Sequence, residues 1–159
     1  MSLGAVATEV TMFMEDMQPY QYGVPVALAD VFAIGWLSAE QAYPKGELNP
    51  AVIRMIEKLL STHRVNQMRG YHTCELCGRS PIGWTTASGK EVLLGSAEIW
   101  IPSLDQKRMY AAPDLIYHYV VDHEYLPPRE FQEAVLAAPE LSSWSAERES
   151  RRLLESAFK

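Results

Sequence analysis

The sequence predicts an α+β fold in which a small antiparallel hairpin or sheet and flanking helices surround a zinc site. Three observations predict it: apolar residues that recur at helical spacing, two extended runs joined by a short turn, and paired cysteines and histidines. The chain has 159 residues, of which 48% are apolar and 21% charged, as in ordinary soluble globular proteins. This length is sufficient for one domain with a sizeable core.

The N-terminal third contains one strand candidate and one clear helix. Residues 31–37 are β-branched and aromatic enough for a buried strand. Asn49 is a favourable N-cap, and Pro50 suits the first helical position. The apolar residues that follow lie at helical spacing: Val52, Ile53, Ile56, Leu59 and Leu60. We therefore expect a helix from Pro50 onwards.

Two extended runs predict a β-hairpin in the middle of the chain. Residues 91–102 form the first run and residues 107–112 the second, and residues 103–106 connect them. A second helix is expected to start at Pro113, with Asp114 near its positive end, and to finish before Pro127.

Two further helices are expected in the C-terminal part. The first covers residues 129–138, and the second begins at Ser143 or Ser145 and is densely charged. We therefore divide the chain into a zinc-stabilised globular domain, residues 1–140, and a charged C-terminal helix, residues 141–159. Leu153, Leu154 and Phe158 form an apolar patch near its end, through which the chain could oligomerise.

Charge and hydropathy exclude several classes of partner. The net charge of −6 argues against binding to nucleic acids and anionic membranes, because such binding depends on clustered Lys and Arg. The longest apolar runs are much shorter than the roughly 20 residues of a membrane span. The N-terminus lacks the pattern of a secretion signal. We expect a soluble, cytoplasmic protein.

The residues that carry chemistry are two cysteines and two histidines. Cys74 and Cys77 form a C-x2-C pair followed by Gly78, which allows the backbone to turn beneath the sulfurs. His118 and His123 follow after a long separation. Zn²⁺ prefers four nitrogen or sulfur ligands in a tetrahedron, and these four residues supply them. We expect a structural zinc ion, because a complete protein ligand set leaves no position for a water.

The histidine spacing places a condition on this ligand set. His118 and His123 would lie about 140° apart on a continuous helix, so the helix must unwind near Asp122 for both to reach one ion. Asp122 and His72 remain alternative ligands. The order of knuckle, hairpin and helix over residues 70–126 resembles the treble-clef group of zinc folds.

Three strings carry a wider resemblance. They are HTCELC at residues 72–77, EIWIP at residues 98–102 and YAAPDLIYHYVVDHEYLPP at residues 110–128. Together with Gly35-Trp36-Leu37, they resemble an uncharacterised family of small bacterial proteins over residues 31–136. The resemblance implies a compact bacterial domain with a metal site, and it brings no established activity.

The predicted function is non-enzymatic: a zinc-binding protein that acts through protein–protein interaction, with an immunity protein or antitoxin that binds a basic toxin as one form. Aromatic residues, which are favoured at protein interfaces, gather around the site in the sequence: Trp84, Trp100, Tyr110, Tyr117, Tyr119 and Tyr125. The same residues could instead pack around the zinc core.

The alternative is a zinc-dependent hydrolase or nuclease with Glu98 or Glu124 as base. It requires one proposed ligand to leave the metal so that a water can bind there. Neither the deaminase signature nor the H-E-x-x-H metalloprotease signature is present. The predicted helix from residue 114 to 126 contains no Lys or Arg, which argues against a nucleic-acid recognition helix.

Overall fold

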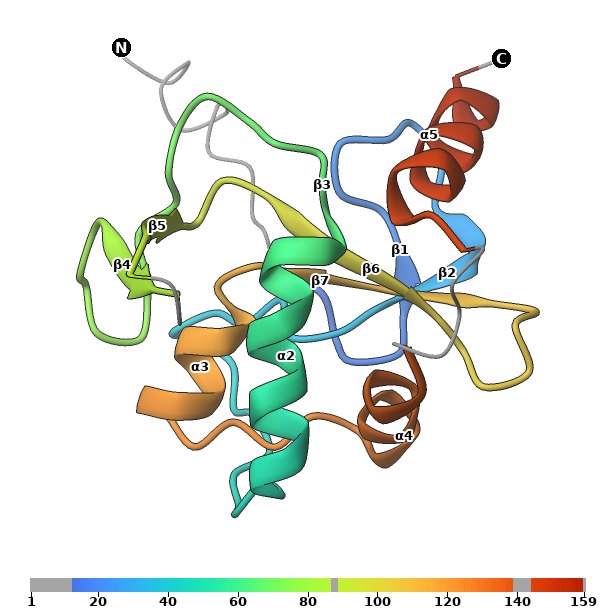
Figure 1. The fold of residues 1–159 in the computed structure, drawn as a ribbon. Helices are drawn as coiled ribbons and strands as arrows, with labels where there is room; N and C mark the ends of the chain where they lie inside the picture. The colour runs from blue at the N-terminus through green and yellow to red at the C-terminus, as the bar shows by residue number, and fades with distance from the viewer. Residues whose placement is uncertain (1–12, 87–88, 139–143, 159) are drawn as a thin grey trace, which may run out of the picture.

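A mixed five-stranded sheet forms the centre of the computed structural model, which describes residues 13–86, 89–138 and 144–158 (Figure 1). The strand order is β1-β2-β7-β6-β3. Strands β2 and β7 run parallel, and the other neighbouring pairs are antiparallel. The strands are β1 (Pro19–Tyr20), β2 (Leu28–Ala33), β3 (Arg64–Val65), β6 (Glu98–Pro102) and β7 (Met109–Pro113).

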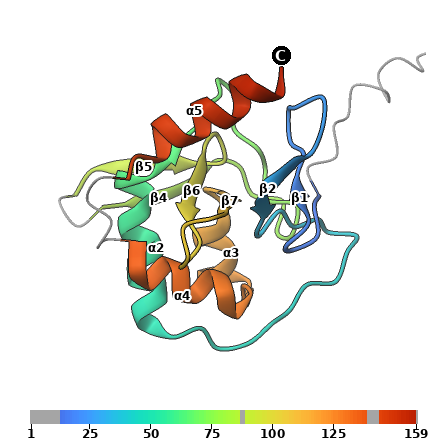
Figure 2. The same cartoon turned by 90° about the vertical axis from the view of Figure 1, so that its right-hand side faces the viewer.

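Helices cover both faces of this sheet. Figures 1 and 2 show α2 (Pro50–Thr62), α3 (Ile116–Asp122) and α4 (Arg129–Ala137) on one face, and α5 (Ala146–Ala157) on the other. The fold class is α+β, as predicted. Among the described residues, no helix combines the length and the apolar character needed to cross a membrane.

The alternation of side chains along the strands produces two cores. On β6, Ile99 and Ile101 point into the core beneath α2, α3 and α4, whereas Trp100 points to the opposite face. Strand β7 behaves in the same way, with Tyr110 on the helix-rich face and Ala111 on the other. Because the period of a strand is two residues, each central strand contributes to both cores.

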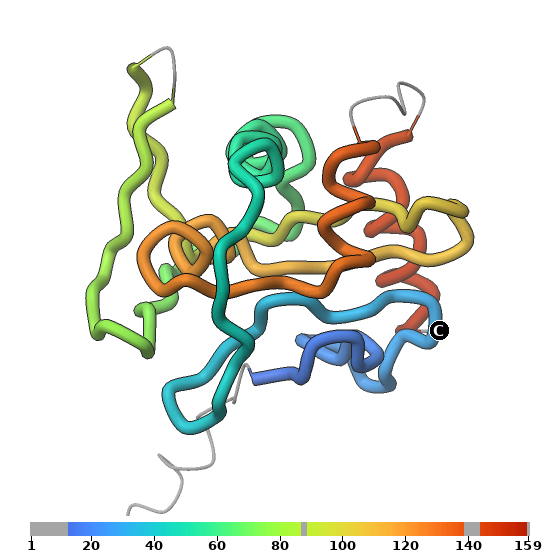
Figure 3. Tube along the Cα trace, turned by 90° about the horizontal axis from the view of Figure 1, so that it is seen from below, coloured from blue at the N-terminus to red at the C-terminus, as the bar shows by residue number. Residues whose placement is uncertain are grey.

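The predicted hairpin is confirmed for residues 98–113, but the first extended run is divided. Residues 91–94 form β5 (Glu91–Leu94), which pairs with β4 (Ile82–Thr85) in a separate two-stranded sheet. This small hairpin extends away from the main sheet (Figure 3). The break falls at Gly95, whose φ is +109° and where a Cβ would lie 2.7 Å from the His72 carbonyl oxygen. A residue with a side chain would be strained and crowded at this position.

The predicted start of the second helix was wrong. Pro113 ends strand β7, and α3 begins only at Ile116. The pairing of β7 with β2 ends at Ala111, so the absent N–H of Pro113 costs no bond to β2. Asp114 is fully buried: it accepts a hydrogen bond from the Gly95 N–H at 2.7 Å and pairs with Arg64 at 3.0 Å.

The other predicted elements agree closely with the structure. The Asn49 side chain caps α2, and α4 starts at Arg129 as expected. The predicted strand at residues 31–37 lies three residues earlier, at Leu28–Ala33, although Ile34, Trp36 and Leu37 are also buried. Ser145 caps α5, whereas the alternative start at Ser143 lies outside the described residues. Helix α5 packs on β3 and β6 rather than standing apart from the sheet.

Candidate metal centre

The structure brings the four predicted metal ligands together at one point. Cys74 and Cys77 lie on the loop before β4, His118 lies on α3, and His123 lies immediately after α3. Their sulfur and nitrogen atoms all lie within 4.8 Å of one another. Cys74 and His118 are buried, whereas Cys77 is exposed and His123 is half-buried. The group therefore sits at the surface end of the helix-rich core.

The cysteine pair occupies a tight knuckle. Gly78 has a φ of +73° and donates its N–H to the Cys74 carbonyl oxygen at 2.7 Å. The backbone N–H groups of Leu76 and Cys77 point at the Cys74 sulfur and favour its thiolate form. The trailing glycine thus closes the turn in the way the sequence predicts.

The end of α3 satisfies the condition on the histidine spacing. The helix ends at Asp122, and His123 leaves it with φ and ψ of −122° and 11°. Glu124 then adopts a φ of +55°, which reverses the chain. The Tyr43 hydroxyl donates to the His123 carbonyl oxygen at 3.1 Å and holds this bend. Because the helix unwinds here, both imidazoles face the knuckle.

The spacing of the donor atoms matches a tetrahedral ion. Ligand distances of about 2.3 Å for sulfur and about 2.05 Å for nitrogen place a sulfur and a nitrogen about 3.5 Å apart, and two nitrogens about 3.3 Å apart. The structure has 3.5 Å for Cys74 Sγ to His123 Nε2 and for Cys77 Sγ to His118 Nε2. The two Nε2 atoms lie 3.2 Å apart. Two sulfurs and two imidazoles also suit zinc better than they suit Mg²⁺ or Ca²⁺.

Asp122 orients one of the imidazoles. Its Oδ2 lies 2.8 Å from His118 Nδ1, and Arg79 Nη2 lies 3.7 Å from the same oxygen. The N–H of His118 is therefore directed to Asp122, which leaves the Nε2 lone pair facing the cluster. Burial lowers the pKa of His118 and raises that of Cys74. A neutral imidazole is the form that binds a metal, whereas the thiol must lose its proton.

The two alternative ligands have other partners. Asp122 contacts His118 from outside the cluster. His72 Nε2 lies 3.3 Å from the Tyr22 hydroxyl, and His72 is not part of the group of four.

The aromatic residues that the sequence offers for an interface are mostly core residues. Trp84, Trp100, Tyr110, Tyr119 and Tyr125 are buried, and Tyr117 is half-buried. Tyr110 packs edge-on against Phe131, and the hydroxyl of Tyr125 donates to both oxygens of Asp16 at 2.8 Å. Their packing therefore favours the core alternative over an aromatic interface.

A second polar cluster was missed by sequence reasoning. Glu98 is only 4% exposed, and both of its oxygens accept from the Tyr20 hydroxyl at 2.9 Å. Its Oε1 also accepts from Trp100 Nε1 at 2.8 Å and from Asn66 Nδ2 at 3.3 Å. Burial raises the pKa of Glu98 to about 7. Tyr20, Asn66, Glu98 and Trp100 share no spacing motif, so no signal in the sequence connects them.

Comparison with known families adds one relationship. Residues 12–136 match the model of a family described as a domain of unknown function, DUF7919. The chain belongs to this family. All four residues of the metal cluster lie within the region matched by DUF7919, whereas α5 lies beyond it. Neither the curated proteins nor the solved structures provide a match to this chain.

Proposed function

We propose that this DUF7919 chain is a non-enzymatic bacterial zinc protein, in which a structural zinc ion is held by Cys74, Cys77, His118 and His123. The observation that carries this proposal is the spacing of the four donor atoms, with 3.5 Å between sulfur and nitrogen and 3.2 Å between the nitrogens. Zinc bound by four protein ligands has no open position at which to activate a water.

The zinc ion would connect two segments that lie far apart in the sequence. The knuckle lies on the long loop between β3 and β4, and the histidines lie at the end of α3. Zinc bound there supplies folding energy, because its ligands converge only in the folded chain. The knuckle is followed along the chain by the β4–β5 hairpin, by strands β6 and β7, and then by α3, and this order supports a treble-clef-like arrangement.

We further propose that the protein acts by binding another protein, and that a basic partner such as a toxin is the best match to its charge. The net charge of −6 supports a basic partner, because complementary charge speeds association and selects partners. Such a complex would persist through gel filtration at low salt and dissociate at high salt. A chain that elutes as a free monomer beside the basic candidate at low salt would contradict this part of the proposal.

Among the residues that the structure describes, no contact supports the hydrolase alternative. Tyr20, Trp100 and Asn66 hold the Glu98 carboxylate on the sheet face away from Cys74. Glu124 is exposed and follows His123 in a backbone conformation with positive φ.

Metal analysis of the purified protein tests the zinc proposal. We expect one zinc ion per chain in the native protein and less than about a tenth of that in Cys74→Ser and His118→Ala, since each variant removes a ligand. His72→Gln is the matched control, because it removes a nearby histidine from outside the cluster and should keep the metal. Native protein without zinc, or full zinc content in His118→Ala, would overturn the proposal.

A further inference from the structure

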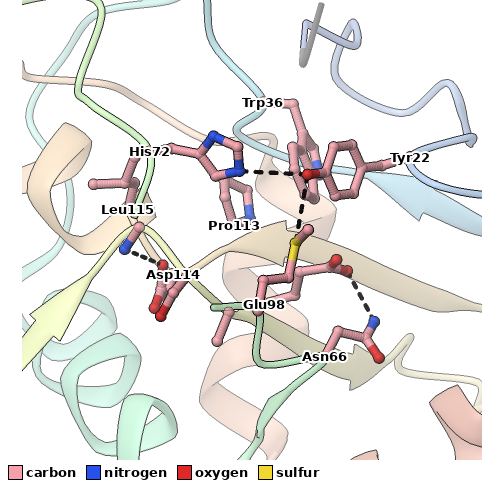
Figure 4. Close-up of a pocket in the computed structure, with 12 residues that line it drawn as sticks. Tyr22, Trp36, Asn66, His72, Glu98, Pro113, Asp114 and Leu115 are labelled. Atoms are coloured by element: carbon pink, nitrogen blue, oxygen red, sulfur yellow. Dashed lines mark hydrogen bonds between the residues drawn. The ribbon is translucent and has the colours of Figure 1, made fainter. Parts of the chain in front are cut away.

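The metal cluster brings a reactive side chain to the surface of the protein, because Cys77 is exposed. The pocket beside the Glu98 cluster differs, since the side chains around it contact one another. The Tyr22 hydroxyl lies 3.3 Å from His72 Nε2 and 3.5 Å from the Met68 sulfur (Figure 4). Of these two clusters, it is therefore the metal cluster that a small reagent in solution can reach, at Cys77.

The exposed cysteine lies beside a buried one. Cys74 and Cys77 are the two cysteines of the sequence, and both are free thiols in the structure. Their sulfur atoms lie within 4.8 Å of each other, and a disulfide requires about 2.05 Å. Both belong to the knuckle that Gly78 closes, so the two sulfurs can bond within one turn of the chain, without a movement of α3.

Each of the two sulfurs faces a different histidine of the cluster. Cys74 Sγ lies 3.5 Å from His123 Nε2, and Cys77 Sγ lies 3.5 Å from His118 Nε2. The thiolate is the form of cysteine that binds a metal, so a disulfide would remove both sulfur ligands in one step. Two imidazoles alone do not complete the four-ligand set of a structural zinc site. The zinc ion would then leave, and its contribution to the folding free energy would be lost.

We propose that Cys74 and Cys77 form a redox switch, in which a hydroperoxide converts them to a disulfide, zinc is released and the fold loses its stability. This inference rests on the proposed function, since it requires zinc at the four residues, and it adds the regulation of that site. Accessibility and an adjacent second cysteine are the properties of cysteines that sense oxidants. Exposure assigns the first step to Cys77 and the second to Cys74.

The reaction has two balanced steps. In the first, the Cys77 sulfur attacks one oxygen of the peroxide and the O–O bond breaks. Cys77 becomes a sulfenic acid, and the other oxygen takes up a proton and leaves as an alcohol, or as water from hydrogen peroxide. In the second, the Cys74 sulfur attacks the Cys77 sulfur, the S–O bond breaks, and the hydroxyl takes up a proton and leaves as water. The two sulfurs lose two electrons, and the peroxide gains them.

Hydrogen peroxide added to the zinc-containing full chain at pH 7 tests the switch. A zinc-binding dye follows the metal, and thiol labelling counts the free cysteines. We expect one zinc ion to be released for each disulfide formed, with loss of the cooperative thermal transition. Dithiothreitol and added zinc should restore the thiols, the bound metal and the transition. Met68→Leu is the control, because it removes an exposed residue that peroxide also oxidises, and it should respond like the native chain.

A variant and a labelling experiment test the role of Cys77. Cys77→His replaces the exposed sulfur by another zinc ligand that cannot form a disulfide, so peroxide should release its zinc at least tenfold more slowly. On the native chain, limited reaction with iodoacetamide should modify Cys77 at least tenfold more often than Cys74, as located by mass spectrometry of peptides. This second measurement does not depend on the stability of the variant.

The outcomes separate the switch from the function on which it rests. A native chain without zinc would contradict both. A chain that gives up its zinc to a chelator but keeps it in peroxide would contradict the switch alone. Zinc release with both cysteines converted to sulfinic acids, equally fast release from Cys77→His, or faster labelling of Cys74 would also overturn the switch.

Discussion

The metal cluster and the Glu98 cluster lie on opposite faces of the same sheet. The buried polar groups of the two clusters are stabilised in different ways. Cys74 belongs to the core beneath α2, α3 and α4, whereas Glu98 contacts Tyr20 and Trp100 in the core on the other face. In the first cluster, the donors are arranged at the distances of a tetrahedral cation. In the second, three neutral groups surround one acid. A bound cation can stabilise the first, whereas a proton is enough for the second.

Removal of zinc acts on the metal cluster alone, and it should have the largest effect on the stability of the chain. Structural zinc contributes about 10–16 kcal/mol of binding energy in small zinc domains, which is comparable with the whole stability of a typical protein. We therefore expect a strong chelator to abolish the cooperative thermal transition of the native chain, as followed by circular dichroism. Added zinc should restore it.

Glu98→Gln is the control for chelation, since it alters the other cluster and keeps all four ligands. Its transition should also disappear with chelator and return with zinc. If the native chain unfolds at the same temperature with and without chelator, zinc does not stabilise the metal cluster. The proposed difference between the two clusters would then be wrong.

Sequence spacing was sufficient to predict that Cys74, Cys77, His118 and His123 lie together, but it did not predict the Glu98 cluster. The C-x2-C pair forms its knuckle from neighbouring residues, and the two histidines lie only five positions apart at a helix end. By contrast, Tyr20 and Glu98 are 78 positions apart, and Asn66 reaches Glu98 from the loop after β3. Only the sheet order brings them together, and no local pattern encodes that order.

The predictions of the fold that depend on local sequence patterns were correct, whereas those that depend on contacts between distant segments were not. Helices α2 and α4 depend on caps and periodicity within their own residues. Helix α2 starts at the predicted Pro50, and both ends of α4 were predicted within one residue. The parallel pairing of β2 with β7 and the break at Gly95 depend on distant segments, namely the crossover and the loop at His72. Pro113 was misplaced because its place in β7 depends on pairing with Glu98 of β6.

Glu98→Gln should also reveal the cost of the buried acid as pH rises. The pKa of Glu98 is raised from an ordinary 4.5 to about 7, so the folded chain holds this proton more tightly than the unfolded chain. Between these values, the unfolding free energy of the native chain falls as pH rises, by on the order of 3 kcal/mol in total. Glu98→Gln should lack this component, since it has no proton to lose.

This pH-dependent change in the free energy of unfolding is measured by denaturant titration of both chains with bound zinc. The titrations are made in amine-free buffer at pH 5 and at pH 8. The difference between the chains isolates Glu98, because Asp114, Tyr20, Tyr22 and His72 are common to both. We expect Glu98→Gln to gain stability over the native chain at pH 8 relative to pH 5. A difference that does not change between the two pH values would show that Glu98 carries no buried charge.

Asp122→Ala should give the smallest effect, confined to the metal cluster. It removes the oxygen 2.8 Å from His118 Nδ1 and leaves all four ligands in place. Loss of such a partner lowers metal affinity by roughly 10–100-fold. Competition with a zinc-binding dye measures this change, and Asp105→Ala, at an exposed turn, is the control. Equal affinity in Asp122→Ala and the native chain would show that His118 needs no orientation.

X-ray absorption spectroscopy of the zinc in the native chain is the most direct measurement of the central claim. The account predicts two sulfur ligands at about 2.3 Å and two imidazole nitrogens at about 2.05 Å, with no further oxygen ligand. A zinc-bound water or carboxylate in place of one of the four residues, or a disulfide between Cys74 and Cys77 with no zinc, would contradict it.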